Sequence, residues 1–395
     1  MKVCILSTYY PAKCGIAEYA SELAQSLQSR GVEVHVIAVD QGIEKLTYPN
    51  IVSFVIRRDE IKDYLEAAEH INDMDIDVLI IQHEYGIFGG ECGSYLIDLM
   101  KRVRVPIITT LHTVVPPPND YMRSITERIL RLSALITIMS RSSLRILRKY
   151  YNAYEGDKIY IVPHGVKTIY VGRRDEIRKE LGINNNFVML TIGLLGPNKG
   201  VKFAISALPK IAKHVDNVLY LVVGETHPKL RMMRGDIHRE KLMKLSYKLN
   251  VEERVIFINK FLTKEDYVKY IIASDVVVLP YIDEMQVSSG TLSYALSYGK
   301  AIVATPFIYA REMLSNGRGI LCKFKDPNSI AEAIIKLAKN PKLKAQIEYN
   351  ALKYGLRLRW DVVSDQLLKL LANLTLENEY VGEGSYVTPT YAKVS

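Results

Sequence analysis

Two short polar segments contain the residue types that bind phosphate in proteins. The first, "SSGT" at 288–291, opens a stretch with helical periodicity, so its backbone N–H groups are free and lie at the positive end of the helix dipole. The second, "GLLGPNKG" at 193–200, has Gly193 and Gly196, which allow close approach of the backbone, and Lys199, which can neutralise a phosphate. Each segment alone is a weak signal, because serine-rich caps and glycine turns are common. Together they favour a site for a diphosphate, which would be a good leaving group.

Short β-rich runs alternate with helical patterns along almost the whole chain. Runs in the first half include "VCILSTYY", "VLIIQHEYG" and "VPIITTLHT", and runs in the second half include "FVMLTIGLLG", "VLYLVVGE" and "DVVVLPY". This alternation predicts parallel sheets with helices on both faces, and two such series predict two doubly wound α/β domains. We place the first domain at 1–165, the second at 166–360, an amphipathic helix at 361–374 and a mobile tail at 377–395.

Polar residues follow the strands of both series at the end where parallel sheets bind ligands. The six polar strand exits are 9–15, 83–90, His112, 193–200, 224–228 and 283–291. All six fall on the same edge of their sheets, whereas chance would scatter them over both edges. Two facing domains would therefore gather these segments into one cleft.

Three other patterns argue against metal or nicotinamide chemistry. "DMDID" at 73–77 has an Asp-x-Asp spacing, but it precedes a strand and lies at the opposite sheet edge, so we interpret it as a solvated turn. "GIFGGECG" at 86–93 does not match the G-x-G-x-x-G fingerprint of dinucleotide sites. The four cysteines have no CxxC spacing, which predicts buried thiols rather than disulfides or a zinc site.

The chain of 395 residues carries a net charge of +9, which favours anionic partners such as phosphates, an acidic membrane surface or nucleic acid. The charge alone does not choose among them. The basic segment 123–149 could lie on a membrane surface. We favour two ordinary helices flanking a buried strand, because "ALITIMS" is typical of a core strand. The chain lacks a long apolar run, so we expect a cytoplasmic protein, with contact to the inner face of the membrane as an option.

Six motifs occur in order along residues 1–374. They are "YYPAKCGIAEYASELAQSLQSRGVEVHVI", "ITTLHT", "VPHGV", "GLLGPNKG", "VVVLPY" with "SYGKAIVATP", and "RWDVVSDQLLKLL". In this order they resemble the retaining glycosyltransferases of family 4, the group 1 glycosyl transferases. That family has the GT-B fold, in which two Rossmann-like domains face each other across a cleft.

The resemblance implies transfer of a hexose, mannose or glucose, from a nucleoside diphosphate sugar to an acceptor hydroxyl with retention at the anomeric carbon. GDP-mannose and UDP- or ADP-glucose are the candidate donors, and the acceptor is a sugar, a sugar phosphate or a lipid-linked sugar. The second domain would bind the donor and the first the acceptor, with the helix at 361–374 crossing back onto the first. No metal, other cofactor or nucleic acid is implied. The rival functions are a sugar-nucleotide epimerase or hydrolase of the same fold, and an inactive nucleotide-sugar binding protein.

The resemblance also assigns site residues. His112 should lie against the donor sugar, Lys199 should bind the diphosphate and Gln286 should hold the far hydroxyls of the sugar. The expected donor-binding residues are Gly15, Gly193, Lys199, Glu284, Gln286, Ser288, Ser289, Gly290, Thr291 and Tyr294, with base contacts near 260–262. The acceptor candidates are Tyr9, His83 and Glu84, although His83 and Glu84 could equally pair with each other. His227, before Pro228, could be only a turn residue.

This chain departs from the family pattern at three positions. The family's paired glutamates fall on Gln286 and Tyr294, and its phosphate-binding arginine falls on Leu194. Gln286 can still hydrogen-bond a sugar hydroxyl through its amide, but a tyrosine cannot clasp a ribose diol as a carboxylate does. These substitutions indicate a divergent subgroup and leave open how the ribose of the donor is held.

Overall fold

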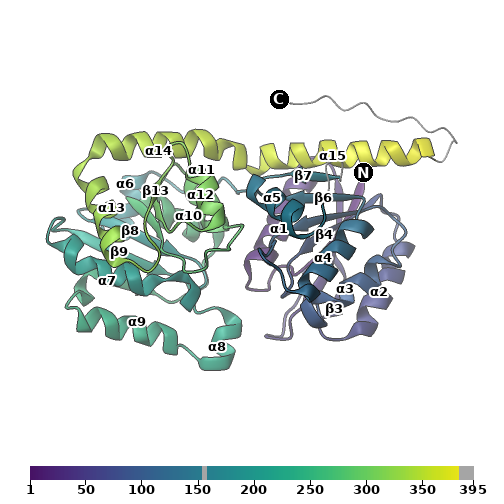
Figure 1. Cartoon of the computed structure of the whole chain (residues 1–395), viewed down its shortest axis with the longest axis horizontal. Helices are drawn as coiled ribbons and strands as arrows, with labels where there is room; N and C mark the ends of the chain where they lie inside the picture. The colour runs from purple at the N-terminus through teal and green to yellow at the C-terminus, as the bar shows by residue number, and fades with distance from the viewer. Residues whose placement is uncertain (154–157, 382–395) are drawn as a thin grey trace.

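The computed structural model describes the backbone of residues 1–153 and 158–381, and side chains as far as residue 374. It has two lobes side by side, each built on a parallel sheet with helices on both faces (Figure 1). The first sheet has the strand order β3-β2-β1-β4-β5-β6-β7, and the second has the order β10-β9-β8-β11-β12-β13. The fold is therefore the predicted pair of doubly wound α/β domains.

The first domain contains the seven strands β1 (Lys2–Ser7), β2 (Glu33–Asp40), β3 (Val52–Arg57), β4 (Val78–His83), β5 (Ile107–Leu111), β6 (Leu135–Ile138) and β7 (Ile159–Ile161). Its helices are α1 (Gly15–Gln28), α2 (Ile61–Asp73), α3 (Tyr95–Met100), α4 (Asp120–Leu132) and α5 (Arg141–Tyr150), with a 3₁₀ turn η1 (Glu91–Gly93). Every residue of β4, β5 and β6 is buried, as expected for central strands covered on both faces.

The second domain contains the strands β8 (Phe187–Ile192), β9 (Val218–Val223), β10 (Val255–Ile258), β11 (Val276–Leu279), β12 (Ala301–Ala304) and β13 (Ile320–Leu321). Its helices are α6 (Arg174–Glu180), α7 (Val201–Ala212), α8 (Pro228–Arg234), α9 (Ile237–Lys248), α10 (Lys264–Ala273), α11 (Gly290–Ser297), α12 (Ile308–Met313), α13 (Pro327–Lys339) and α14 (Pro341–Gly355), with 3₁₀ turns η2 (Pro197–Lys199), η3 (Glu252–Arg254) and η4 (Leu356–Leu358). The predicted boundary at 165/166 lies in the connection between β7 and β8.

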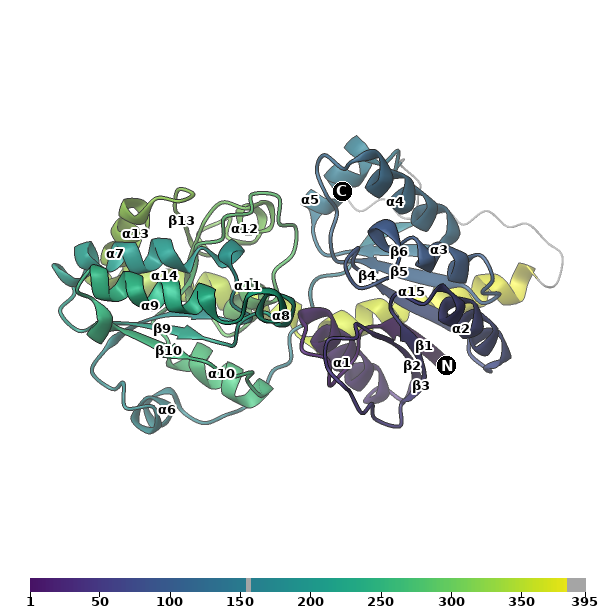
Figure 2. The same cartoon turned by 90° about the horizontal axis from the view of Figure 1, so that it is seen from below.

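Helix α15 (Trp360–Val381) crosses back from the second domain and packs along α1 of the first (Figures 1 and 2). Ser26 donates from its hydroxyl to the carbonyl of Trp360, and Ser364 donates to Ser26, both in buried contacts. The helix continues to Val381, so the predicted start of the mobile tail at 377 was wrong. Residues 382–395 of that predicted tail lie outside the described residues.

The basic segment 123–149 folds as the buried strand β6 between helices α4 and α5, the arrangement that we favoured from its sequence. Ile125 and Ile129 of α4 and Leu147 of α5 are buried, and the arginines occupy the outer faces. Contact of this basic face with a membrane stays a prediction. Within the described residues, no helix is both long and apolar enough to cross a bilayer.

Candidate active site between the two domains

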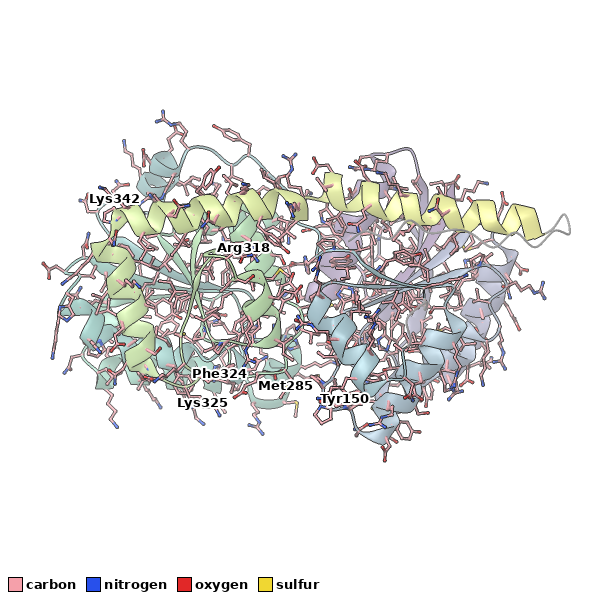
Figure 3. All side chains as sticks on the ribbon, turned by 45° about the horizontal axis from the view of Figure 1, so that its top comes forward. Tyr150, Met285, Arg318, Phe324, Lys325 and Lys342 are labelled. Carbon is pink, nitrogen blue, oxygen red and sulfur yellow. The ribbon has the colours of Figure 1, made fainter. Side chains whose placement is uncertain are left out.

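A cavity of about 560 Å³ lies between the two domains. The first domain contributes the start of α1 and the exit of β5, and the second contributes the exits of β8, β9, β10 and β11. The loop that follows β11 reaches the first domain: Val287 packs into its core, and Figure 3 shows Met285 on the side of the second lobe that borders the first. Five of the six predicted polar strand exits meet at this cavity.

The N-terminus of α11 opens into the cavity. Ser289 caps the helix by accepting a hydrogen bond from the N–H of Leu292, so the N–H groups of Gly290 and Thr291 have no carbonyl one turn before them. A Cβ at Gly290 would lie 3.2 Å from Nε2 of His164, which leaves little room for a side chain there. Ser288 donates from its hydroxyl to the carbonyl of His112 at 2.9 Å, which fixes this end of the helix against the first domain.

The glycine turn after β8 lies beside the N-terminus of α11, since a Cβ at Gly193 would lie 3.7 Å from Oγ1 of Thr291. Gly193 has φ 117°, and a Cβ at Gly224 would lie only 2.0 Å from the carbonyl oxygen of Gly193. The backbones at the ends of β8 and β9 can therefore lie this close only because both residues are glycines. Lys199, at the end of η2, has its Nζ 4.3 Å from the ring centroid of Tyr281, a cation–π distance. Gly193, Leu194 and Lys199 all line the cavity. The cationic side chain of Lys199 and the free N–H groups of α11 therefore share one pocket.

His112 lies at the first-domain side of the cavity with only 4% of its surface exposed. Its Nε2 is 2.8 Å from Oε1 of Gln82, and its ring meets the ring of Tyr19 edge to face at 4.8 Å. Burial, together with the neighbouring His164 and His83, lowers the pKa of His112 to about 3. The ring is neutral near pH 7, so it acts as a hydrogen-bonding group and not as a cation.

The predicted sugar-binding loop is only partly in the cavity. Gln286 lines it, and its Nε2 donates to the carbonyl of Ser288 at 2.8 Å. Glu284 is exposed and does not line the cavity, so the prediction that it binds the donor finds no support in the geometry. The chain turns at Glu284 and Met285, so Glu284 points to solvent while Gln286 points into the cavity.

A second cavity of about 390 Å³ adjoins the first and shares Cys14, Gly15, Ile16 and His227 with it. It contains the sixth strand exit. Helix α8 reaches across the domain junction at this point, where Nζ of Lys229 donates to the carbonyl of Gly86 (Figure 2). The two cavities are therefore neighbours that share part of their walls.

Only one of the three predicted acceptor residues faces this second cavity. Glu84 lines it, is held by the hydroxyl of Thr113, and has its pKa raised by burial. His83 has no exposed surface and packs between the rings of Tyr85 and Phe88, and Tyr9 is a core residue with 5% exposure. The predictions of acceptor contact for His83 and Tyr9, and of a His83 to Glu84 pair, are therefore corrected.

Sequence reasoning missed a polar network at the other end of the first cavity. Glu22 of α1 accepts hydrogen bonds from the hydroxyl of Tyr294 at 2.6 Å and from Nε1 of Trp360 at 2.8 Å. Lys264 of α10 pairs with Glu22 at 2.9 Å and with Glu18 at 3.0 Å. The available signal was the pair of glutamates four residues apart on a helix whose neighbouring positions are apolar. Tyr294 lines the cavity, but its hydroxyl is engaged by the first domain.

His164, within the "VPHGV" motif, is a second residue that sequence reasoning left without a role. It lines the cavity, its Nδ1 contacts the carbonyl of Gly165 at 2.8 Å, and its ring meets Tyr19 at 5.1 Å. Burial lowers the pKa of His164. Among residues 1–153 and 158–381, no three His, Cys, Asp or Glu side chains are grouped to hold a metal ion.

Two family models match consecutive parts of the chain. Residues 14–169 match the model described as Glycosyltransferase Family 4, and residues 173–354 match the model described as Glycosyl transferases group 1. Together they span both domains and include all the residues that line the first cavity.

Curated relatives match over most of the chain. N-acetyl-alpha-D-glucosaminyl L-malate synthase of Bacillus anthracis is 25% identical, with 87% of this chain and 89% of the relative covered. Phosphatidyl-myo-inositol mannosyltransferase of Mycolicibacterium smegmatis is 23% identical, with 90% of this chain and 89% of the relative covered.

Solved structures show the same fold. The crystal structure of Anabaena HepE in complex with UDP and glucose has a TM-score of 0.74 at 17% identity and covers 94% of this chain and 100% of its own. Sucrose-phosphate synthase from Thermosynechococcus elongatus has a TM-score of 0.76 at 16% identity and covers 95% of this chain and 100% of its own. The chain belongs to the group 1 glycosyl transferases of glycosyltransferase family 4 and has their GT-B fold.

Proposed function

We propose that the protein transfers a hexose, glucose or mannose, from a nucleoside diphosphate sugar to an acceptor hydroxyl and retains the anomeric configuration. The observation that carries this proposal is the convergence of Lys199 with the N–H groups of Gly290 and Thr291 on one cavity. These groups supply positive charge where a diphosphate becomes the leaving group. The adjoining cavity at Glu84 supplies space for an acceptor.

In this mechanism the bond between the anomeric carbon and the phosphate oxygen breaks while the acceptor oxygen bonds to the same carbon on the same face. The proton of the acceptor hydroxyl passes to an oxygen of the departing phosphate, so no protein nucleophile is needed. The protein orients the two substrates and stabilises the developing negative charge. In this proposal Lys199 and the N-terminus of α11 stabilise the negative charge that develops on the diphosphate, and no metal is required.

His112 and Gln286 orient the hexose in this proposal. Neutral His112 holds Gln82 through Nε2, which leaves Nδ1 as the hydrogen-bond acceptor of the ring for a sugar hydroxyl. The amide of Gln286 replaces a carboxylate that would otherwise accept from two hydroxyls. In this proposal the hexose sits on the His112 side of the diphosphate.

The names of similar proteins support glucose or mannose as the transferred sugar. HepE was solved with UDP-glucose, and one relative is a mannosyltransferase. The proposed acceptor is a sugar, a sugar phosphate or a lipid-linked sugar, bound beside Glu84 in the second cavity, which Lys13 and Lys229 also line. These two lysines suit an acceptor with a negatively charged group. We place the reaction in the cytoplasm, with membrane contact required only for a lipid-linked acceptor.

The test is product analysis with UDP-glucose, ADP-glucose and GDP-mannose, each with and without a panel of sugar, sugar-phosphate and lipid-linked acceptors. The proposal predicts acceptor-dependent loss of donor and a product whose anomeric proton signal by NMR shows the donor configuration. Donor consumption without an acceptor would favour the hydrolase or epimerase. Binding of the donor with no turnover under any condition would favour an inactive binding protein.

A further inference from the structure

One stretch of the first cavity lies between the α11 N-terminus and the exit of β10. The first turn of α10 lines this stretch together with residues 260–262: Lys264 and Tyr267 both line the cavity, and the hydroxyl of Tyr267 donates to the hydroxyl of Thr291 at 3.1 Å. This placement rests on the proposed function. With the diphosphate at Thr291 and the hexose toward His112, the nucleoside must extend in the other direction, along Tyr267 and Lys264. The ribose, which is next to the diphosphate, falls in this stretch.

A ribose presents two vicinal hydroxyls, and a carboxylate is the side chain that accepts hydrogen bonds from both. Within the described residues, the carboxylates that line the first cavity are those of Glu18, Glu22 and Glu225. Glu225 pairs with Lys13 at 3.2 Å and with Arg231 at 3.9 Å, beside the second cavity. It is therefore at the wrong end of the site for a ribose.

Glu22 is already occupied by protein groups. Its Oε1 accepts from the hydroxyl of Tyr294 and contacts Nζ of Lys264, its Oε2 accepts from Trp360, and only 7% of its surface is exposed. A ligand hydroxyl that bonded to Glu22 would have to displace one of these partners. Glu22 is therefore a positioning residue that holds Lys264 and Tyr294.

Glu18 has the opposite character. It lies one helical turn before Glu22 on α1, its side chain is 38% exposed, and its Oε2 bonds to Lys264 at 3.0 Å. Its Oε1 has no hydrogen-bond partner among the described side chains and backbone groups. Lys264 thus holds one oxygen of a carboxylate that lines the cavity, and the other oxygen is left for a ligand.

We infer that Glu18, from the first domain, is the residue that binds the ribose hydroxyls of the nucleotide and makes the site specific for ribonucleotides. The carboxylate that the second domain lacks at Tyr294 is then supplied across the cleft. As a consequence, both domains bind the nucleotide: the second domain contacts its diphosphate and the first domain contacts its ribose. Donor binding therefore depends on the closed arrangement of the two domains.

The experiment compares a ribonucleoside diphosphate with its 2′-deoxy counterpart by calorimetric titration, using UDP with dUDP, GDP with dGDP and ADP with dADP. For the base that binds, we expect the wild-type protein to prefer the ribonucleotide by about ten-fold or more, because hydrogen bonds to a charged group are the stronger kind. Glu18→Gln and Glu18→Ala should bind the ribonucleotide more weakly and reduce that preference to about two-fold or less. Glu265→Gln, an exposed position on α10 that does not line the cavity, is the matched control and should keep the full preference.

Equal affinity of the wild-type protein for both members of a pair would overturn the inference, and so would an undiminished preference in Glu18→Ala. Either result leaves the proposed function intact, because the diphosphate would still bind. If none of the nucleotides bound to the wild-type protein, the result would contradict both the proposed function and this inference. Glu18 is partly exposed, so the thermal midpoint of each variant without nucleotide should stay close to that of the wild type.

Discussion

The hydroxyl of Tyr294 in the second domain donates a 2.6 Å hydrogen bond to Oε1 of Glu22 in the first domain. Because Glu22 also accepts from Trp360 at the start of α15 and pairs with Lys264, one carboxylate joins α1, α10, α11 and α15. The bond crosses the cleft at the end of the first cavity that α10 lines. Because Tyr294 and Glu22 both line the cavity, a change in the packing of the domains at this bond would also change the shape of the cavity.

Tyr294→Phe should therefore destabilise the protein. The substitution keeps the ring, which is 4% exposed, and removes one of the hydrogen bonds that satisfy the buried carboxylate of Glu22. A hydrogen bond to a charged group contributes about 1.5–3 kcal/mol, so for a chain of this size we expect the thermal midpoint to fall by about 2–4 °C. The measurement is differential scanning calorimetry, with Tyr349→Phe at an exposed position as the control. An unchanged midpoint would show that the bond adds nothing to stability.

Lys199→Met should weaken donor binding and slow transfer. The variant keeps most of the side-chain volume beside Tyr281 but loses the charge that would face the diphosphate. Removing one group that stabilises a transition-state charge costs on the order of 10²–10³-fold in kcat. Lys202→Met, on the exposed side of α7, is the control and should keep wild-type kinetics. Equal kcat/KM for Lys199→Met and Lys202→Met would mean that Lys199 is only a surface lysine.

Glu312 of α12 makes a second connection between the domains. Its carboxylate accepts from the N–H groups of Arg141 and Ser142 at 2.9 and 2.8 Å, and from the hydroxyl of Ser142 at 2.6 Å, at the N-terminus of α5. Glu312→Ala should free this helix end and favour a more open arrangement of the domains. We expect a larger radius of gyration by small-angle scattering and a donor KM raised about three- to ten-fold, since each lost cap is about 1 kcal/mol. Glu332→Ala, at a surface ion pair within the second domain, should change neither quantity.

His83 should make the protein sensitive to acid. Both ring nitrogens are buried without a hydrogen-bond partner within the described residues, and burial lowers the pKa of His83 from 6.5 to about 4. The unfolded chain binds a proton below pH 6.5 while the folded protein does not, so stability is full above pH 6.5 and falls as the pH drops toward 4. The loss from this one group is roughly 3 kcal/mol by pH 4.

His83→Met should reduce this acid sensitivity. The measurement is the thermal midpoint from pH 7 to pH 4, where the variant should lose fewer degrees than the wild type. His35→Met, at a partly exposed histidine on β2, provides the comparison and should follow the wild-type curve. Identical curves for the His83 variant and the wild type would contradict the account of His83 as an unpartnered core histidine.

The sequence predicted the fold better than the directions of individual side chains. Alternation of strand and helix patterns identified both sheets, and the rule for strand exits located the cavity lining at His112, Lys199 and 288–291, because both depend only on local order along the chain. Tyr9 and His83 also stand near strand exits, yet they point into the core. The exit rule gives a position along the strand but not the face on which a side chain lies.

The Glu18, Glu22 and Lys264 network was missed for a different physical reason. Glu18 and Glu22 are visible in the sequence as a pair on one helix, but they meet Lys264 only after the two domains pack across the cleft, so no local pattern predicts that contact. Tyr294 shows the same limit. The sequence shows that a tyrosine replaces the family's glutamate at this position. It does not show that the tyrosine hydroxyl bonds to Glu22, because Glu22 belongs to the other domain.

The most direct test of the central claim is thermal unfolding of the wild type and Lys199→Met with GDP, UDP, ADP and TDP and their hexose conjugates at matched concentration. A ligand that binds the folded protein raises the midpoint in proportion to its affinity and concentration. The account predicts a clear shift of the wild type with one base, a further shift with a hexose conjugate of that base, and smaller shifts in Lys199→Met. No shift with any nucleotide, or equal shifts in both proteins, would contradict a diphosphate site between Lys199 and the N-terminus of α11.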